Sequence, residues 1–524
     1  MGGNTLNKKV FTILLVVFFT AIAAFHFTLN FSRRNGPPSN EWSKEVLIST
    51  GNIQSNPSLI RYKDNYIVAH SDGDKIKVLS VDKLGKKLEE KTFNANGAEP
   101  QSTNVLTEGK ELYVYWTISE DGKKTIYNVR LDDKFNVLEE SKIHGANEII
   151  TIGESVIVLN YDGNKIGVND LSTGKSYSIS TNNAEFLSGT RNKEGYIISF
   201  KQKGGELKYF TIINGEASEP KTAGKLEEIS IISYLSSTLV ADDSFAYMMM
   251  EYRNRGEFGG TKIIKFSLKE EGKFQADDFK IDKSKIEILN VSPYYIEGAA
   301  KFLARKQVQY NKKDDYANIV EYNLTNPKEF IALSRTKELS MYPAAVEDVA
   351  IFCDVVGKDK FNLYMTSKNE EFKSIHNNLR SADVKLALLD TAAGILYSFV
   401  YIIPYGALWV IPTIGMISVY SILEYKISSK KKKRGFALIY LAYFIFKSMG
   451  IQFVSFERFK YFMPQFMSFE LSLLFSLCIS LSCGIYAYTK YSDGVESNIG
   501  AINLITPMIC DTILTLMIVV PFMV

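Results

Sequence analysis

Residues that build disulfides and metal sites are scarce in this sequence. The 524 residues include 4 cysteines and 4 histidines. Cys353 alone lies in the polar middle of the chain, because the other three cysteines fall in the apolar C-terminal part. A disulfide framework is therefore excluded for the middle, which must be stable through its own hydrophobic core. The sequence has no Cys-x-x-Cys motif and its histidines are scattered, so we expect neither a metal site nor a bound cofactor.

A strong charge of one sign is also absent. Lys and Arg together number 61, Asp and Glu number 58, and the formal net charge is +3. A dedicated nucleic-acid-binding protein has a concentrated basic face, which this balance does not predict. The sequence also lacks the glycine-flanked serine of a nucleophile elbow and the His-Glu pair of a zinc-protease helix. We therefore assign no catalytic residue, and expect a protein that is not an enzyme and does not bind nucleic acid.

What is present is a recurring hairpin pattern. Its clearest copy runs from Tyr66 to Val78, where two runs of apolar and β-branched residues flank Asp72-Gly73. Asp-Gly in this setting predicts a type I′ turn, which needs positive φ at both central residues. Further turns are predicted at Asp121-Gly122 and Asp162-Gly163, with looser copies at Gly204-Gly205, Gly259-Gly260, Asp314-Asp315 and Gly357-Lys358.

These turns follow one another at intervals of roughly 40–55 residues, a period typical of β-propellers, whose blades are four-stranded sheets. The seven units predict a seven-bladed β-propeller over residues 41–380. Trp42–Ile48 is predicted to be a lone strand before the first unit. We expect this strand to complete the last blade, because closure of the ring removes the sheet edges that invite aggregation. The last unit itself is predicted to have only three clear strands, Ala345–Phe352, Phe361–Thr366 and Glu371–Ile375.

The first 35 residues contain an apolar run. Val10–Phe31 is long enough for one membrane span, with Lys8-Lys9 before it and Arg33-Arg34 after it. Ala21-Ile22-Ala23 resembles the cleavage site of a signal peptide, which is the alternative interpretation. Because the apolar run continues well past Ala23, we favour an uncleaved anchor over residues 1–35, followed by a linker over residues 36–40.

A second change of composition occurs after Lys385, since Leu386–Leu423 contains a single charge, Asp390. One helix of this length would be about 57 Å long, too long for a single span. Two spans would place the basic run Lys430–Arg434 on the same side as the propeller, which the positive-inside rule opposes. We therefore predict a stalk or interfacial helix over residues 381–403.

The remaining residues, 404–524, are predicted to form a four-helix transmembrane domain. Together with the N-terminal anchor this gives a multi-pass plasma-membrane protein, with Lys430–Arg434 in the cytoplasm and the propeller on the extracytoplasmic side. The four predicted spans lie near Tyr401–Leu423, Gly435–Phe453, Phe466–Tyr488 and Gly500–Val524.

Two charges fall inside the predicted spans. Lys447 and Asp511 each lie about 17 Å from the cytoplasmic end of their helices, near the middle of the bilayer. An isolated charge at that depth costs roughly 3 kcal/mol or more, so opposite charges at equal depth are expected to pair. The pair could relay protons or a substrate, or it could hold two helices together. We favour the structural role, because few other polar residues follow a path through the spans.

Arg253 and Arg255, followed by Gly256, are candidate contacts for an anion or a partner at the rim of the propeller. The function that we expect is a non-enzymatic binding, sensing or assembly module, held in the lipid bilayer and presenting its propeller to a protein, peptide or glycan. Two alternatives remain open, a component of a transport or export system that uses the C-terminal helices, and a propeller-type hydrolase or lyase. Clustered carboxylates in a polar channel would favour the hydrolase, and a polar path through the helices would favour transport.

Overall fold

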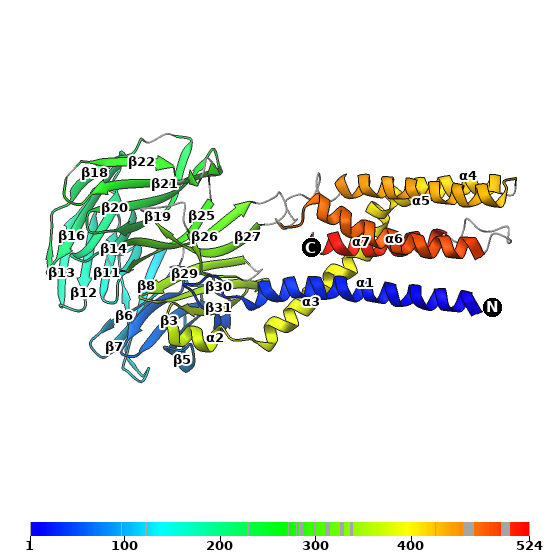
Figure 1. Cartoon of the computed structure of the whole chain (residues 1–524). Helices are drawn as coiled ribbons and strands as arrows, with labels where there is room; N and C mark the ends of the chain where they lie inside the picture. Colours follow the sequence, from blue (N-terminus) through cyan, green and yellow to red (C-terminus); the bar gives the residue numbers. More distant parts are fainter. Residues whose placement is uncertain are drawn as a thin grey trace. The chain divides into compact units, whose positions relative to one another are not determined.

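Seven antiparallel sheets follow one another along the polar part of the chain and form the blades of a β-propeller (Figure 1). This computed structural model divides into two compact units, Gly36–Asn378 and a second that joins Met1–Asn35 to Leu379–Val524. The seven-bladed propeller predicted from the turn period is confirmed. The structure describes residues 2–95, 97–120, 123–227, 230–270, 272–278, 280–281, 284–285, 287–296, 299–309, 315–324, 330–335, 339–424, 426–453, 466–493 and 504–522.

The first three blades have the same four-stranded order, in which each strand pairs with the next one in sequence. The second strand of each is almost entirely buried, as expected for the most apolar strand of the unit. Their strands are β2 (Ser58–Tyr62), β3 (Asn65–Asp72), β4 (Lys75–Asp82) and β5 (Lys87–Asn94); β6 (Ser102–Glu108), β7 (Glu111–Glu120), β8 (Lys123–Leu131) and β9 (Val137–Ile143); and β10 (Glu148–Ile152), β11 (Val156–Tyr161), β12 (Lys165–Asp170) and β13 (Lys175–Ser180).

The next three blades vary this order slightly. In the fourth blade two short strands, β17 and β18, both pair with the third strand, and a two-stranded ribbon of β23 and β24 precedes the sixth blade. The strands are β14 (Glu185–Arg191), β15 (Gly195–Lys201), β16 (Glu206–Ile213), β17 (Glu216–Ala217) and β18 (Lys221–Lys225); β19 (Ile232–Ala241), β20 (Phe245–Asn254), β21 (Glu257–Ser267) and β22 (Phe274–Asp278); β23 (Lys280–Ile281) and β24 (Ser284–Lys285); and β25 (Glu287–Ile296), β26 (Ala299–Gln309), β27 (Asp315–Asn323) and β28 (Phe330–Ala332).

The seventh blade closes the ring with a strand from the start of the propeller. Its order is β29 (Leu339–Val346), β30 (Val349–Gly357), β31 (Lys360–Ser367) and then β1 (Val46–Gly51). The predicted closure is therefore confirmed, although the strand begins later than the predicted Trp42–Ile48. Trp42 and Ser43 precede the strand but are fully buried, and the Ser43 amide donates to the Ser367 carbonyl at 3.0 Å. The closing segment thus extends beyond the paired strand itself.

The prediction of a strand over Glu371–Ile375 is wrong. The segment belongs to helix α2 (Glu370–His376), which the Asn369 side chain caps by accepting from the amides of Glu371 and Phe372. Phe372 is fully buried in the core of the first and last blades. A capping asparagine followed by two glutamates is a helix-start signal, and it outweighs the weak alternation of apolar residues in so short a segment.

The predicted turns need two corrections. Gly259-Gly260 lies inside β21, and the turn of the fifth blade falls at Arg255-Gly256, where both residues have positive φ. In the first blade, Asp72 pairs with Lys75 and only Gly73 has positive φ, as in a type II′ turn rather than type I′. Asp121-Gly122 and part of Asp314-Asp315 lie outside the described residues.

His70 joins the first blade to the last one at the point of closure. It lies on β3 and is fully buried. Its Nδ1 donates to the Ser71 carbonyl at 2.8 Å, which leaves Nε2 to accept from the Ser49 hydroxyl of β1 at 3.0 Å. The pKa of His70 is lowered from 6.5 to about 4, chiefly by burial. Lys77 also lowers this pKa, whereas the Ser71 hydrogen bond, Asp72 and Glu90 raise it. The neutral ring is therefore the form that fits the closed propeller.

Acidification should loosen the propeller through His70. Between pH 6.5 and 4 the His70 side chain is protonated in the unfolded chain but not in the folded one. Its contribution to the free energy of unfolding is therefore fully present above pH 6.5 and is lost as the pH falls towards 4. The loss between pH 7 and pH 5 should be about 2 kcal/mol. His70→Gln should flatten the pH dependence of the unfolding temperature of the detergent-purified protein, whereas replacement of the exposed His144 by Gln should not. Parallel curves for wild type and His70→Gln would rule this assignment out.

The second unit is helical. Five helical segments are long and apolar enough to cross a membrane, Lys9–Ser32, Ile402–Glu424, Lys431–Ile451, Phe469–Thr489 and Ile505–Phe522, which confirms the predicted one N-terminal and four C-terminal candidates. The helices are α1 (Gly2–Asn35), α3 (Ser381–Val400), the π-helix η1 (Ile402–Gly406), α4 (Ala407–Glu424), α5 (Ser429–Ile451), α6 (Phe469–Asp493), α7 (Ile505–Val519) and the 3-10 turn η5 (Val520–Phe522).

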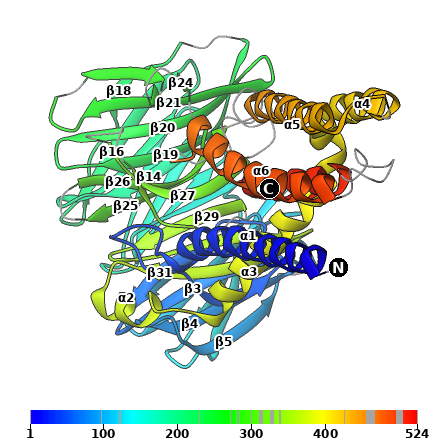
Figure 2. The ribbon, with the colours of Figure 1, turned by 45° about the vertical axis from the view of Figure 1, so that its right-hand side comes forward.

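Helix α3, in the segment predicted as a stalk or interfacial helix, packs along α1 (Figure 2). The Arg34 guanidinium donates to the Asp390 carboxylate at 2.9 Å, and the Asn30 amide donates to the Thr391 hydroxyl at 3.0 Å. The opposite side of α3 exposes leucines such as Leu389 and Leu396. The π-helical turn η1 then separates α3 from α4, in the segment where Pro404 interrupts the helical hydrogen bonds.

Candidate functional site

The first strands of all seven blades line a central channel with a volume of about 880 Å³. Much of its wall consists of side chains that carry a hydroxyl or an amide. Such groups both donate and accept hydrogen bonds and leave space for a ligand. The polar lining residues are Gln54, Ser55, Asn56, Ser58, Gln101, Ser102, Thr103, Asn104, Thr151, Ser188, Thr190, Asn192, Ser237, Thr238 and Ser292.

One end of the channel is charged. Arg191 ends β14, while Glu154 and Glu347 lie in the turns that follow β10 and β29. Arg61 on β2 holds Glu347 in an ion pair of 2.7 Å. Burial raises the pKa of Glu154 above its ordinary value, and the nearby Glu347 raises it further, although Arg191 and Arg61 oppose the shift. The end of the channel therefore offers both carboxylates and guanidinium groups to a ligand.

These charged residues were not predicted from the sequence. Each follows or ends the first strand of its blade, and the turns between first and second strands all lie at the same end of a propeller. That regularity is the signal that could have identified them. To use that signal, one must first locate the first strand of each blade correctly. The turns predicted from the sequence join second and third strands, which places them at the opposite end of the blades.

The structure brings Lys447 and Asp511 together in the second unit. The Lys447 Nζ lies 2.5 Å from the Asp511 Oδ1, and neither side chain is exposed. Lys447 also donates to the Ser480 hydroxyl at 2.8 Å, and that hydroxyl donates to the other Asp511 oxygen at 2.8 Å. The Thr515 hydroxyl donates to Asp511 at 3.4 Å. The pair is thus embedded in hydrogen bonds from α5, α6 and α7.

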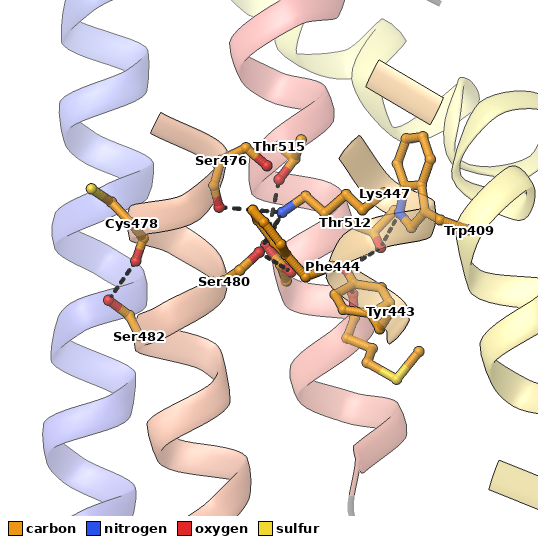
Figure 3. A network of polar contacts seen from close by, with 12 residues as sticks. Trp409, Tyr443, Phe444, Lys447, Ser476, Cys478, Ser480, Ser482, Thr512 and Thr515 are labelled. Atoms are coloured by element: carbon orange, nitrogen blue, oxygen red, sulfur yellow. Dashed lines mark hydrogen bonds and ion pairs between the residues drawn. The ribbon is translucent and has the colours of Figure 1, made fainter. Parts of the chain in front are cut away.

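A second group of polar side chains extends this network to α4 (Figure 3). The Trp409 indole donates to the Thr512 hydroxyl at 3.1 Å, and the Tyr443 hydroxyl lies 3.2 Å from the same Thr512 oxygen. On α6, the hydroxyls of Ser472 and Ser476 are buried without a hydrogen-bond partner among the described residues. Ser472 lies two turns and Ser476 one turn before Ser480, on the same side of the helix.

Arg253 and Arg255 do not belong to either group. Both are exposed, Arg253 near the end of β20 and Arg255 in the turn that follows it, and neither lines the channel. Their turn lies at the end of the blades opposite the one that carries Glu154 and Glu347. Among the described residues, no three or more His, Cys, Asp or Glu side chains gather as they would around a metal ion.

Comparison with known proteins gives only distant structural likenesses. No protein-family model and no curated protein sequence matches this chain. Among solved structures, the chain is similar to the N-terminal domain of Nup159, at 11% identity and a TM-score of 0.39 over 63% of this chain and 96% of that one. It is also similar to the WD40 domain of Toxoplasma gondii coronin, at 8% identity and a TM-score of 0.40 over 67% and 91%. A third similar structure is the Dos1 propeller, at 12% identity and a TM-score of 0.35 over 57% and 75%.

Proposed function

We propose that this chain is a membrane-anchored, non-enzymatic binding, sensing or assembly module, whose propeller takes a polar segment of a protein, peptide or glycan into its central channel. The observation that carries the proposal is the channel itself, which all seven blades line and to which the first six contribute the hydroxyl and amide side chains named above. Its volume of about 880 Å³ lies within the range of ligand sites, roughly 300–1,000 Å³. An uncharged polar wall with charges gathered at one end suits a ligand that is polar along its length and ionic at its tip.

The five apolar helices support the anchoring part of the proposal. The basic residues Lys431–Arg434 begin α5 and are followed by an apolar span, which favours a cytoplasmic position for this end of the helix. The propeller is then extracytoplasmic, at the plasma membrane, because a single span connects it to the short N-terminal segment with Lys8-Lys9.

A labelling experiment tests this orientation. In a chain whose native cysteines are replaced by alanine, a cysteine introduced at Ser429 should react with a membrane-impermeant maleimide only after the membrane is permeabilised. A cysteine at the exposed Lys203, in the turn between β15 and β16, should react in intact cells and serves as the control. Labelling of the Ser429 position in intact cells would show that the orientation is wrong.

The channel assignment is tested by purifying the intact protein in mild detergent and identifying what co-purifies. Arg191→Gln should lower recovery of the partner about tenfold or more, because a hydrogen bond to a charged group contributes about 1.5–3 kcal/mol. Arg253→Gln removes the same charge from the exposed rim and should leave recovery unchanged. If Arg253→Gln lowers recovery of the partner and Arg191→Gln does not, the partner binds at the rim and not in the channel. Cleavage of the partner by wild type but not by Glu154→Gln would replace this proposal by the hydrolase alternative.

A transport role is the second candidate, and the buried hydroxyls of Ser472 and Ser476 favour it. Polar groups without a partner inside a membrane domain are costly unless water or a substrate reaches them. They lie on the side of α6 that carries Ser480, whose hydroxyl donates to Asp511, and a substrate path would run along this side. The double substitution described in the Discussion separates this role from a structural one.

A further inference from the structure

An apolar groove of about 560 Å³ lies between α4 and α5, which are neighbours in the second unit (Figure 1). Pro412, Gly415 and Val419 contribute its wall from α4, and Leu438 contributes from α5. Val419 and Leu438 are 62% and 65% exposed. The groove therefore opens outward from the helices, on a surface that faces lipid if the chain is inserted as proposed.

Two glycines shape this groove. A Cβ at Gly415 would meet no atom within 4 Å, so this position is open space. At Gly435 the situation is the reverse, because the Tyr420 ring occupies the place of a Cβ at 2.5 Å. The Tyr420 hydroxyl also donates to the Lys432 carbonyl at 2.8 Å. The groove is thus open near Gly415 and ends near Gly435, in the second turn of α5.

The segment that leads to this end of the groove is strongly basic. Lys431, Lys432, Lys433 and Arg434 immediately precede Gly435, which itself lines the groove. Lys431 and Arg434 are exposed, whereas Glu424, the last residue of α4, is buried. A topology signal requires only the positive charges. It does not require an apolar groove that leads directly to them.

We propose that this groove binds an acyl chain of an anionic phospholipid, whose headgroup is held by the basic residues Lys431–Arg434. The apolar wall matches the chain, and the four positive charges match a headgroup with a net negative charge. The bound lipid fills the space at Gly415 and pins α4 to α5, the helix that carries Lys447. This inference rests on the proposed insertion in a membrane, and it assigns a ligand to a part of the chain that the propeller does not involve.

Native mass spectrometry of the full-length protein in mild detergent tests the headgroup contact, with phosphatidylglycerol and phosphatidylcholine of equal chain length added together. Wild type should retain the anionic lipid over the zwitterionic one by at least about fivefold. Replacing Lys431, Lys432, Lys433 and Arg434 with Gln should abolish this preference, and replacing the three lysines with Arg should preserve it. Equal retention of both lipids by wild type would overturn the proposal.

The groove is tested separately with Gly415→Leu, whose side chain should occupy the space of the acyl chain and lower retention of both lipids. Ala437→Leu places the same leucine side chain at an exposed position of α5 that does not line the groove, and should have no effect. Unchanged retention in Gly415→Leu, with an unfolding temperature like that of wild type, would show that the groove is not the site. Release of the chain from membranes by an alkaline wash would instead refute the membrane anchoring itself, so the two failures are distinguishable.

Discussion

Replacement of Lys447 by Met, or of Asp511 by Asn, is expected to destabilise the helical unit by roughly 3–5 kcal/mol, because each change leaves the other polar group buried without its partner. Lys447 would keep only the Ser480 hydroxyl and the Ser476 carbonyl, at 2.8 and 3.4 Å. Asp511 would keep only hydroxyl donors. The unfolding temperature in detergent and the amount of chain in the membrane measure the effect.

The double substitution Lys447→Met with Asp511→Asn should recover much of this loss, since no isolated charge remains. A stable double variant that still co-purifies with its partner would make the pair structural, as we expect. A stable variant that has lost its cellular activity would make it part of a relay. A double variant no better than the worse single one would show that the residues are not coupled.

The Arg34–Asp390 pair provides a matched control in the same unit. Its side chains are 16% and 21% exposed, whereas those of Lys447 and Asp511 are fully buried. A partly solvated ion pair contributes about 1 kcal/mol or less. Replacing Arg34 by Gln should therefore have a much smaller effect than replacing Lys447 by Met, and equal effects would argue against burial as the cause.

Trp42→Ala should have a comparable effect on the propeller, roughly 3–5 kcal/mol. The indole is fully buried between the sixth and seventh blades, and its Nε1 donates to the buried Glu321 carboxylate at 3.0 Å. Lys301 and Lys368 neutralise this carboxylate at 2.8 and 2.7 Å. Loss of the indole removes both the packing and one hydrogen bond at the junction where the ring closes. A lower unfolding temperature, with faster hydrogen exchange in β1 and β31, is the expected result.

Phenylalanine at the same position separates packing from hydrogen bonding. Trp42→Phe should cost less than Trp42→Ala but more than Trp116→Phe, because the buried Trp116 Nε1 has no hydrogen-bond partner among the described residues. Deleting Val46–Gly51 should expose the edge of β31 and destabilise the whole propeller. An unchanged unfolding temperature after either the deletion or Trp42→Ala would contradict the role assigned to closure.

The number of blades and the closing strand could be predicted because turn residues and apolar runs are local signals that repeat. Helix α2 could not be recognised by periodicity alone, since a seven-residue segment fits both a helix and a strand. Asn369 was the better signal there. The turn of the fifth blade was misplaced because Gly259 and Gly260 resemble a turn but sit at a bulge against Tyr252.

The two candidate sites differ in what the sequence could show. Lys447 and Asp511 stand out because charges are rare in apolar spans, and their equal depth suggested a contact. Ser480 and Thr515 are unremarkable in composition, so the hydrogen bonds that surround the pair were not predicted. The charged end of the channel depends on the ring, which places Glu154 and Glu347 near each other although they lie in different blades.

Because β1 pairs with β31, the propeller can close only late in the synthesis of the chain. Ser43 hydrogen-bonds to Thr366, 323 residues later in the chain. At about 5–20 residues per second, the ribosome needs roughly 16–65 s to make the intervening segment. Throughout that time β1 has been synthesised but its partner strand has not, and its backbone can pair with any other exposed edge. The ring can close only when blade seven emerges, shortly before the four C-terminal helices, so a factor that shields β1 would act in this interval.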